Sequence, residues 1–211
     1  GGALWSYAAL KFLIVFLFGG FFMLAALIGL YVVSLREFGA GTFSFDALTQ
    51  LNMDPGTQRM LFLGFFFAFA VKAPLWPFHT WLPDAATEAQ PGSAVLLVGV
   101  LDKVGTFGML RYCLPIFPEA SQFYTPVIIA ISVIGIIYGA LLAIGQTDIK
   151  RLIAYTSVSH FGFITLGIFA LTSQGQSGST LYMVNHGLST AALFLVAGFL
   201  MSRRGSKFID D

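Results

Sequence analysis

Long stretches without a charged side chain constrain this sequence more than any other feature. One such stretch covers residues 12–35, and another, residues 126–145, is entirely uncharged. A helix needs about 20 apolar residues to cross a bilayer, and only helices or closed barrels satisfy their backbone polar groups inside lipid. Barrel strands would be shorter and would alternate apolar with polar residues. The stretches therefore predict membrane-spanning helices.

Six segments are long and apolar enough to be such helices, which predicts an all-α membrane protein with six transmembrane helices. The second is unusual because Pro74 and Pro77 each lack a backbone donor and crowd the preceding turn. We expect this helix to break there, and such a break is tolerated in a membrane only where protein or a water-filled cavity satisfies the freed carbonyls. The expected spans are residues 4–34, 60–83, 92–114, 126–145, 149–171 and 181–202.

The composition excludes several classes of protein. Charged residues make up 10% of the chain, against roughly 25% in an average soluble domain. A net charge of +1 leaves no basic stripe for nucleic acid. The single cysteine, Cys113, excludes disulfide scaffolds and iron–sulfur ligation within this chain. The sequence has no phosphate-binding loop, nucleophile elbow or metal-ligand spacing, so we expect it to hold neither a cofactor nor a metal.

The ends of the sequence and its basic residues suggest how the chain lies in the membrane. Residue 1 is glycine and the chain stops soon after an apolar segment, so we expect a piece of a longer protein. With alternating helices, the positive-inside rule places the termini and the 84–91 and 146–150 connections in the cytoplasm. The 35–59 connection then lies outside, where apolar residues predict a short interfacial helix. The cytoplasmic set is Lys11, Lys150, Arg151, Arg203, Arg204 and Lys207, against Arg36, Arg59 and Arg111.

Two lysines, Lys72 and Lys103, are expected near the centre of the bilayer. The helical rise of about 1.5 Å per residue places Lys72 about 18 Å beyond residue 60 and Lys103 about 16 Å beyond residue 92. A charge at the centre of a spanning helix costs on the order of 3 kcal/mol, and desolvation favours the neutral form of a lysine. We therefore expect both lysines to exchange protons. The alternative is that each only neutralises a buried carboxylate.

Asp102 precedes Lys103 directly in the sequence. Adjacent residues point about 100° apart on a helix and do not face each other. We therefore expect Asp102 to pair with a basic group on another helix, for which Lys72 is the obvious candidate. An equally acceptable interpretation is that Asp102 lies in a polar pocket that holds Lys103 charged.

Two histidines and one further lysine lie within apolar segments. Histidine gains and loses a proton near neutral pH and therefore suits a relay. We expect a relay role for His186, which lies about five residues into the last expected span, and either a relay or a packing role for His160, near mid-membrane. Their different expected depths argue against a pair of haem ligands. Lys11 either snorkels to the headgroups or takes part in the chemistry.

Three sequence strings carry a family resemblance. Residues 65–85, FFFAFAVKAPLWPFHTWLPDA, resemble the broken seventh helix of the antiporter-like subunits of respiratory complex I, NADH:quinone oxidoreductase. Residues 146–163, QTDIKRLIAYTSVSHFGF, resemble the junction of their ninth and tenth helices. Residues 184–194, VNHGLSTAALF, resemble the eleventh helix of the M-type subunit in particular. The chain thus resembles the sixth to eleventh helices of this proton-translocating subunit.

The resemblance implies an antiporter-like fold of two inverted repeats and a function in proton translocation. Residues 1–118 would close the first repeat and residues 119–211 would open the second. Protons would move through a lysine and histidine relay, coupled to quinone reduction in other subunits. The chain would thus be a non-redox subunit of an enzyme, a translocase.

Individual residues match the family pattern. Lys72 matches the lysine of the broken helix, Lys103 that of the following helix, and His186 the basic residue of the eleventh helix. Lys11 falls where the sixth helix carries a lysine, which favours a functional role for it. Asp102 is a departure, because the M-type pattern usually has an apolar residue there, and a nearby carboxylate favours the charged form of Lys103. The expected proton-translocating residues are Lys11, Lys72, Lys103, His160 and His186.

The resemblance also implies partners. NADH, FMN, iron–sulfur clusters and quinone would be bound by partner subunits. The neighbours of this chain would be other antiporter-like subunits and the lipid bilayer, and nucleic acid is not an expected partner. The location would be an energy-transducing inner membrane, that of the bacterial cell. One alternative is a subunit of a multi-subunit sodium/proton antiporter or a membrane-bound hydrogenase. Another is a structural, lipid- or quinone-binding scaffold, against which Lys72 and Lys103 argue.

Overall fold

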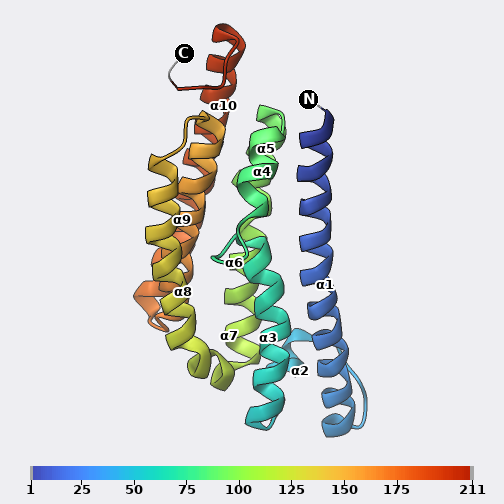
Figure 1. Ribbon diagram of the computed structural model, residues 1–211. Coiled ribbons are helices and arrows are strands. Elements are labelled where there is room, and N and C mark those ends of the chain that lie inside the picture. Colours follow the sequence, from blue (N-terminus) through green and yellow to red (C-terminus); the bar gives the residue numbers. More distant parts are fainter. Residues whose placement is uncertain (1, 210–211) are drawn as a thin grey trace.

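The computed structural model describes residues 2–209 and shows a bundle of long helices (Figure 1). Within these residues the only extended pairing is one antiparallel bridge between Asp148 and Phe208, so the expectation of an all-α membrane protein is confirmed. The outermost residues of the two expected repeats, residues 1, 210 and 211, lie outside the described part. The N- and C-terminal ends of the described chain lie at the same end of the bundle.

Five helical stretches of the described chain are long and apolar enough to cross a membrane. Four are single α-helices: α1 (Gly2–Phe38), α8 (Pro118–Ile144), α9 (Ile149–Phe169) and α10 (Ser173–Arg204). The fifth, which we call the α5–α7 helix, is interrupted by two π-helical turns. It consists of α5 (Pro91–Leu96), η1 (Leu97–Leu101), α6 (Lys103–Gly108), η2 (Met109–Cys113) and α7 (Leu114–Ile116).

The second expected span is divided, so a sixth continuous spanning helix is not found in the described chain. Helix α3 (Pro55–Lys72) ends just before the prolines, residues 73–80 form a turn, and α4 (Trp81–Glu88) follows. The break expected at Pro74 and Pro77 is therefore confirmed. The Trp81 indole nitrogen donates a 2.8 Å hydrogen bond to the carbonyl oxygen of Val71, which satisfies one backbone group at the broken end.

Helices α8 and α10 begin well before the residues that the sequence predicts, because their first turns are stabilised without apolar residues. Helix α10 begins at Ser173 rather than at residue 181, and the side chain of Thr172 caps it by accepting a 3.0 Å hydrogen bond from Gly175 N. Helix α8 begins at Pro118 rather than at residue 126. Proline is favoured in a first turn because its missing N–H has no partner there.

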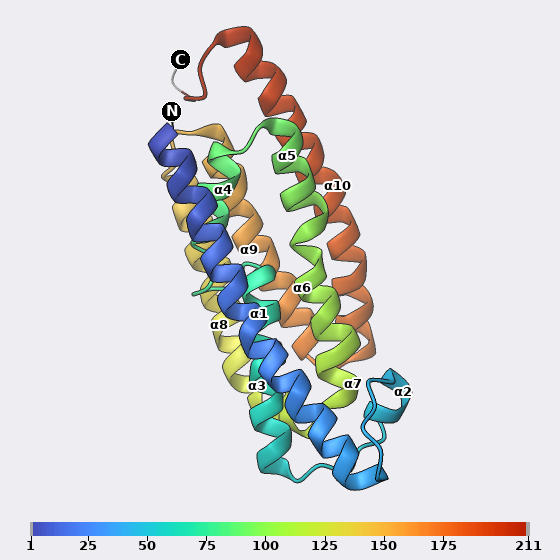
Figure 2. The ribbon, with the colours of Figure 1, turned by 90° about the vertical axis from the view of Figure 1, so that its right-hand side faces the viewer.

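The helices pack with α9 near the centre and with the α5–α7 helix between α1 and α10 (Figures 1 and 2). Helix α9 packs against α8, α10 and α4, while α1 packs against α3 and α4. One apolar core surrounds Phe62, Phe117 and Phe161, and a second surrounds Trp81 and Phe194. This arrangement places the middle of the α5–α7 helix against the broken end of α3 and against α10.

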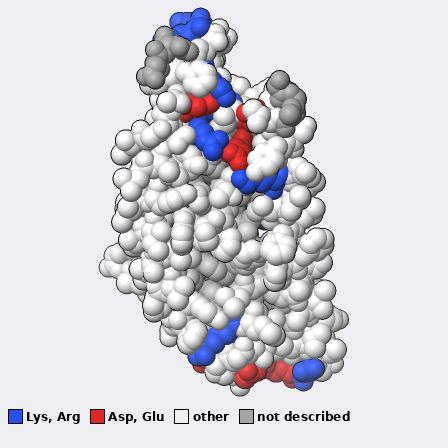
Figure 3. Space-filling view, viewed as in Figure 1, with Lys and Arg blue, Asp and Glu red and all other residues white. Residues whose placement is uncertain are grey.

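The connections alternate between the two ends of the bundle as expected. The termini, the α4–α5 connection and the α8–α9 connection lie at one end, and α2 (Phe45–Leu48) lies at the other (Figure 1). Helix α2 is the short helix expected within residues 35–59. On the face shown in Figure 3, charged side chains gather towards the two ends and leave the surface between them uncharged. Such a belt suits a lipid environment.

Candidate functional site

An ion pair between a completely buried carboxylate and a partly buried lysine lies in the middle of the α5–α7 helix. The side chain of Asp102 has 0% exposure, and its Oδ1 atom lies 2.9 Å from Nζ of Lys103. The Lys103 ammonium also donates a hydrogen bond to the carbonyl oxygen of Val98, one turn back. Neither carboxylate oxygen of Asp102 has a hydrogen-bond partner among residues 2–209, so the ion pair is the only polar contact that the carboxylate makes there. A buried charge of this kind marks a functional site in a membrane protein by default.

The structure pairs Asp102 with its neighbour and not with Lys72. The expectation that adjacent residues cannot meet assumed a regular α-helix, but Asp102 ends a π-helical turn. Its backbone N–H donates to the carbonyl oxygen of Leu97, five residues earlier, over 3.3 Å. The wider turn and the long, flexible lysine side chain let the Lys103 ammonium fold back along its own helix. Asp102 thus forms its ion pair with Lys103 of its own helix.

The two histidines meet in the interior, although the sequence predicted different depths. The ring centroids of His160, on α9, and His186, on α10, are 5.2 Å apart. The prediction was wrong because α10 begins at Ser173, which puts His186 near the middle of the helix. His160 Nδ1 lies 2.6 Å from the Tyr182 hydroxyl. Neither ring nitrogen of His186, which is 3% exposed, has a partner in the described chain.

The phenyl ring of Phe161 joins the ion pair to the histidines. Nζ of Lys103 lies 5.3 Å from the Phe161 ring centroid, and the His186 ring lies 5.2 Å from the same ring. Groups that bind and release protons therefore gather from three helices at one depth. These spacings exceed hydrogen-bond length, so proton transfer between them needs bridging water. We call this set the lysine–histidine cluster: Asp102, Lys103, His160, Tyr182 and His186.

Lys72 lies at the broken end of α3, close to this cluster but without an ion-pair partner among the described residues. Its Nζ atom is 5.1 Å from the Phe16 ring centroid, and the C-terminus of a helix favours a cation. Gly105 of α6 packs directly on this end, since a Cβ atom added to it would lie 2.5 Å from Ala73 N. The glycine therefore brings the Lys103 helix against the Lys72 helix.

Lys11 lies in a separate group of charges at the end of the bundle that holds the termini. Its Nζ atom is 2.7 Å from Asp84 Oδ2, and Nη1 of Arg151 is 3.0 Å from Asp84 Oδ1. Asp84 thus joins α1, α4 and α9. We call this the Asp84 network. No role was predicted for Asp84 from the sequence. Its position directly after the proline-rich segment could have indicated one.

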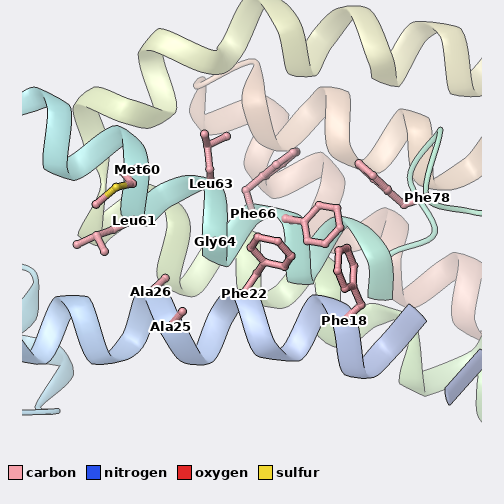
Figure 4. Close-up of a pocket in the computed structure, with 11 residues that line it drawn as sticks. Phe18, Phe22, Ala25, Ala26, Met60, Leu61, Leu63, Gly64, Phe66 and Phe78 are labelled. Atoms are coloured by element: carbon pink, nitrogen blue, oxygen red, sulfur yellow. The ribbon is translucent and has the colours of Figure 1, made fainter. Parts of the chain in front are cut away.

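One large apolar cavity is not part of either group. It has a volume of about 680 Å³ and lies between α1 and α3, with Phe78 from the turn at one end (Figure 4). Phenylalanine, leucine, methionine, alanine and glycine line it, and none of these can bind a proton. In the described part of the chain no group of three or more His, Cys, Asp or Glu side chains could hold a metal ion.

Comparison with known proteins places this arrangement in a family. Residues 3–211 match the family described as NADH:quinone oxidoreductase/Mrp antiporter, TM. The chain is 62% identical to NADH-quinone oxidoreductase subunit M of Mycobacterium tuberculosis, over 100% of this chain and 39% of that protein. It therefore spans about two fifths of that relative, and this likeness confirms the expected resemblance to an M-type subunit.

Solved structures agree with this assignment. A chain of respiratory complex I from Thermus thermophilus with bound NADH superposes with a TM-score of 0.89 at 35% identity, over 97% of this chain and 43% of that one. A chain of the Mrp complex from Dietzia sp. DQ12-45-1b superposes with a TM-score of 0.83 at 25% identity, over 93% of this chain and 35% of that one. The chain therefore belongs to the family of transmembrane subunits shared by NADH:quinone oxidoreductases and Mrp antiporters.

Proposed function

We propose that this chain is part of a proton-translocating subunit in the membrane arm of an NADH:quinone oxidoreductase. The observation that carries the proposal is the buried Asp102–Lys103 pair beside His186 in the bundle interior. A purely structural scaffold would not need charged side chains at that depth, where they cost free energy in a membrane. Protons would pass between Lys72, Lys103 and the two histidines through water, with Lys11 at the end of the bundle.

The proposal extends to the parts of the protein beyond this chain. Residues 1–118 would belong to one inverted repeat and residues 119–211 to the next, so each half of the pathway is only partly contained here. Lys72 would find its carboxylate partner on the preceding, absent helices. Quinone reduction and its cofactors would belong to partner subunits, and the assembly would lie in the bacterial plasma membrane with the Asp84 network facing the cytoplasm.

The test is a pumping assay on the full-length subunit in its assembled complex, reconstituted in vesicles. We expect Lys103→Met to abolish most dye-reported proton movement driven by NADH oxidation, because methionine cannot bind a proton. Arg203→Gln, which changes an exposed cation of α10, is the matched control and should pump normally. Wild-type pumping by Lys103→Met would contradict the proposal.

The same preparation separates the alternative in this family. The superposition on the Mrp complex favours an antiporter as the second candidate. Flavin and iron–sulfur subunits that co-purify in mild detergent would support the oxidoreductase. Sodium-driven proton exchange without such subunits would support the antiporter.

A further inference from the structure

Two buried carboxylates of this chain differ sharply in how their oxygens are satisfied. Asp148 Oδ1 accepts hydrogen bonds from the backbone N–H groups of Lys150 and Arg151, and its Oδ2 lies 2.9 Å from Nζ of Lys207. Asp102 Oδ1 lies 2.9 Å from Nζ of Lys103 in an ion pair, but neither of its oxygens has a hydrogen-bond partner within residues 2–209. The surroundings of Asp148 stabilise a permanent negative charge, whereas those of Asp102 do not.

The incomplete coordination of Asp102 has a physical consequence. A permanently charged buried carboxylate needs hydrogen bonds at both oxygens to offset the loss of its hydration. The partner ammonium of Lys103 is shared with the carbonyl oxygen of Val98, so it does not serve the carboxylate alone. Moving one proton from the ammonium to the carboxylate would remove both charges from the bundle interior at once.

We propose that Asp102 is a proton carrier that takes the proton of Lys103, and not a fixed counter-ion. In this step an N–H bond of the ammonium breaks and an O–H bond forms on Asp102 Oδ1, which leaves a neutral amine and a neutral carboxylic acid. The neutral Lys103 can then accept the next proton from the histidine side, while Asp102 stores the first. This inference rests on the proposed function and assigns a second proton site to it.

The geometry provides for both halves of this step. The donor and acceptor atoms are already 2.9 Å apart as an ion pair, although the contact is not a hydrogen bond. The transfer therefore requires a rotation of the Lys103 side chain that turns an N–H toward Oδ1, but no movement of a helix. On its other side Lys103 faces the Phe161 ring, which His186 also contacts, so it can be recharged from there through water.

The experiment compares infrared difference spectra and proton pumping of the full-length subunit in its assembled complex. Wild type under turnover should show a carboxylic-acid C=O band that is shifted by labelling aspartate with carbon-13, shifted again in Asp102→Glu and missing in Asp102→Asn. Pumping should fall by about a hundredfold or more in Asp102→Asn, since about a hundredfold is the lower end of the range for loss of a proton-transfer group. Asp102→Glu should recover much of it. The exposed Asp46→Asn is the matched control and should match wild type in both readouts.

The outcomes separate this inference from the proposed function. Lys72→Met and Lys103→Met are measured in the same vesicles. If both lose pumping while Asp102→Asn pumps normally, or while no aspartic-acid band appears in wild type, Asp102 is a fixed counter-ion and the inference fails alone. If the two lysine variants also pump normally, the proposed function fails. Should Asp102→Asn not assemble, the labelled wild-type spectrum and its shift in Asp102→Glu decide.

Discussion

Gly187 of α10 lies directly on the carbonyl oxygen of Gly99 in η1: a Cβ atom added to Gly187 would stand 2.8 Å from that oxygen. The reverse change is mild, since a Cβ atom on Gly99 would stand 3.6 Å from Ala191 Cβ and 3.7 Å from Gly187 O. Gly187 therefore sets how closely α10 approaches the helix that carries Lys103. His186, next to Gly187, keeps its distance from Lys103 through this crossing.

The asymmetry of this crossing gives a first prediction. Gly187→Ala should destabilise the subunit by about 1–3 kcal/mol, the usual cost of overpacking, and should lower pumping by moving His186 away from Lys103. Gly99→Ala at the same crossing should stay close to wild type in both stability and pumping. Thermal unfolding and vesicle pumping measure the pair, and equal losses in the two variants would show that the crossing does not set this distance.

Lys72 provides the second prediction. Lys72→Met should strongly reduce pumping while the complex still assembles, because the half-buried ammonium has no ion pair in the described chain whose loss would destabilise the fold. Lys72→Arg should also impair pumping, since a guanidinium scarcely releases a proton. Dye quenching in vesicles measures both. Normal pumping in Lys72→Met would remove this residue from the pathway.

The broken helix is the subject of the third prediction. Replacing Pro74 and Pro77 together by alanine should let α3 continue past Lys72 and shrink the break, because alanine restores the backbone donors. A high-resolution map of the double variant should then show the hydrogen bond from the Trp81 indole to Val71 lost. An unchanged break in that map would mean that this tryptophan and the surrounding packing maintain it without the prolines.

The ion pair in the interior gives the fourth prediction. Asp102→Leu should lower the free energy of unfolding by about 3–5 kcal/mol, the usual loss when one partner of a buried ion pair is removed. The reason is that the charge of Lys103 would be left without a partner. Adding Lys103→Met should recover most of that stability, and pumping of the double variant should be no worse than that of Lys103→Met alone. Thermal unfolding and pumping are measured on all three. Additive losses would show that the two residues do not act as one unit.

The Asp84 network gives the fifth prediction. Asp84→Asn should lower the thermal stability more than Lys11→Met, because it leaves both Lys11 and Arg151 without their shared carboxylate. Each pair is partly exposed, so the difference should be small, about 1 kcal/mol or less per pair. Thermal unfolding of the two single variants measures it. A larger loss in Lys11→Met would mean that Lys11 acts through something other than Asp84.

The sequence by itself determined the features that depend on local chemistry. Uninterrupted apolar stretches determine which segments can span a membrane, and the positions of Pro74 and Pro77 determine where α3 must end, because a proline removes a donor wherever it lies. The burial of Lys72 and Lys103 in mid-span follows from counting residues at a fixed helical rise. None of these inferences requires knowledge of which helices are neighbours.

The tertiary structure alone decided which groups meet. The contact between His160 and His186 depends on α10 starting at Ser173, which is set by the Thr172 cap and not by hydropathy. Asp102 meets Lys103 because a π-helical turn alters the angle between them, and such a turn leaves no mark in an apolar sequence. Partner choice in a bundle is set by which helix faces touch. These helix contacts are fixed by close packing between residues that are far apart in the sequence. Local sequence patterns do not contain the distances between such residues.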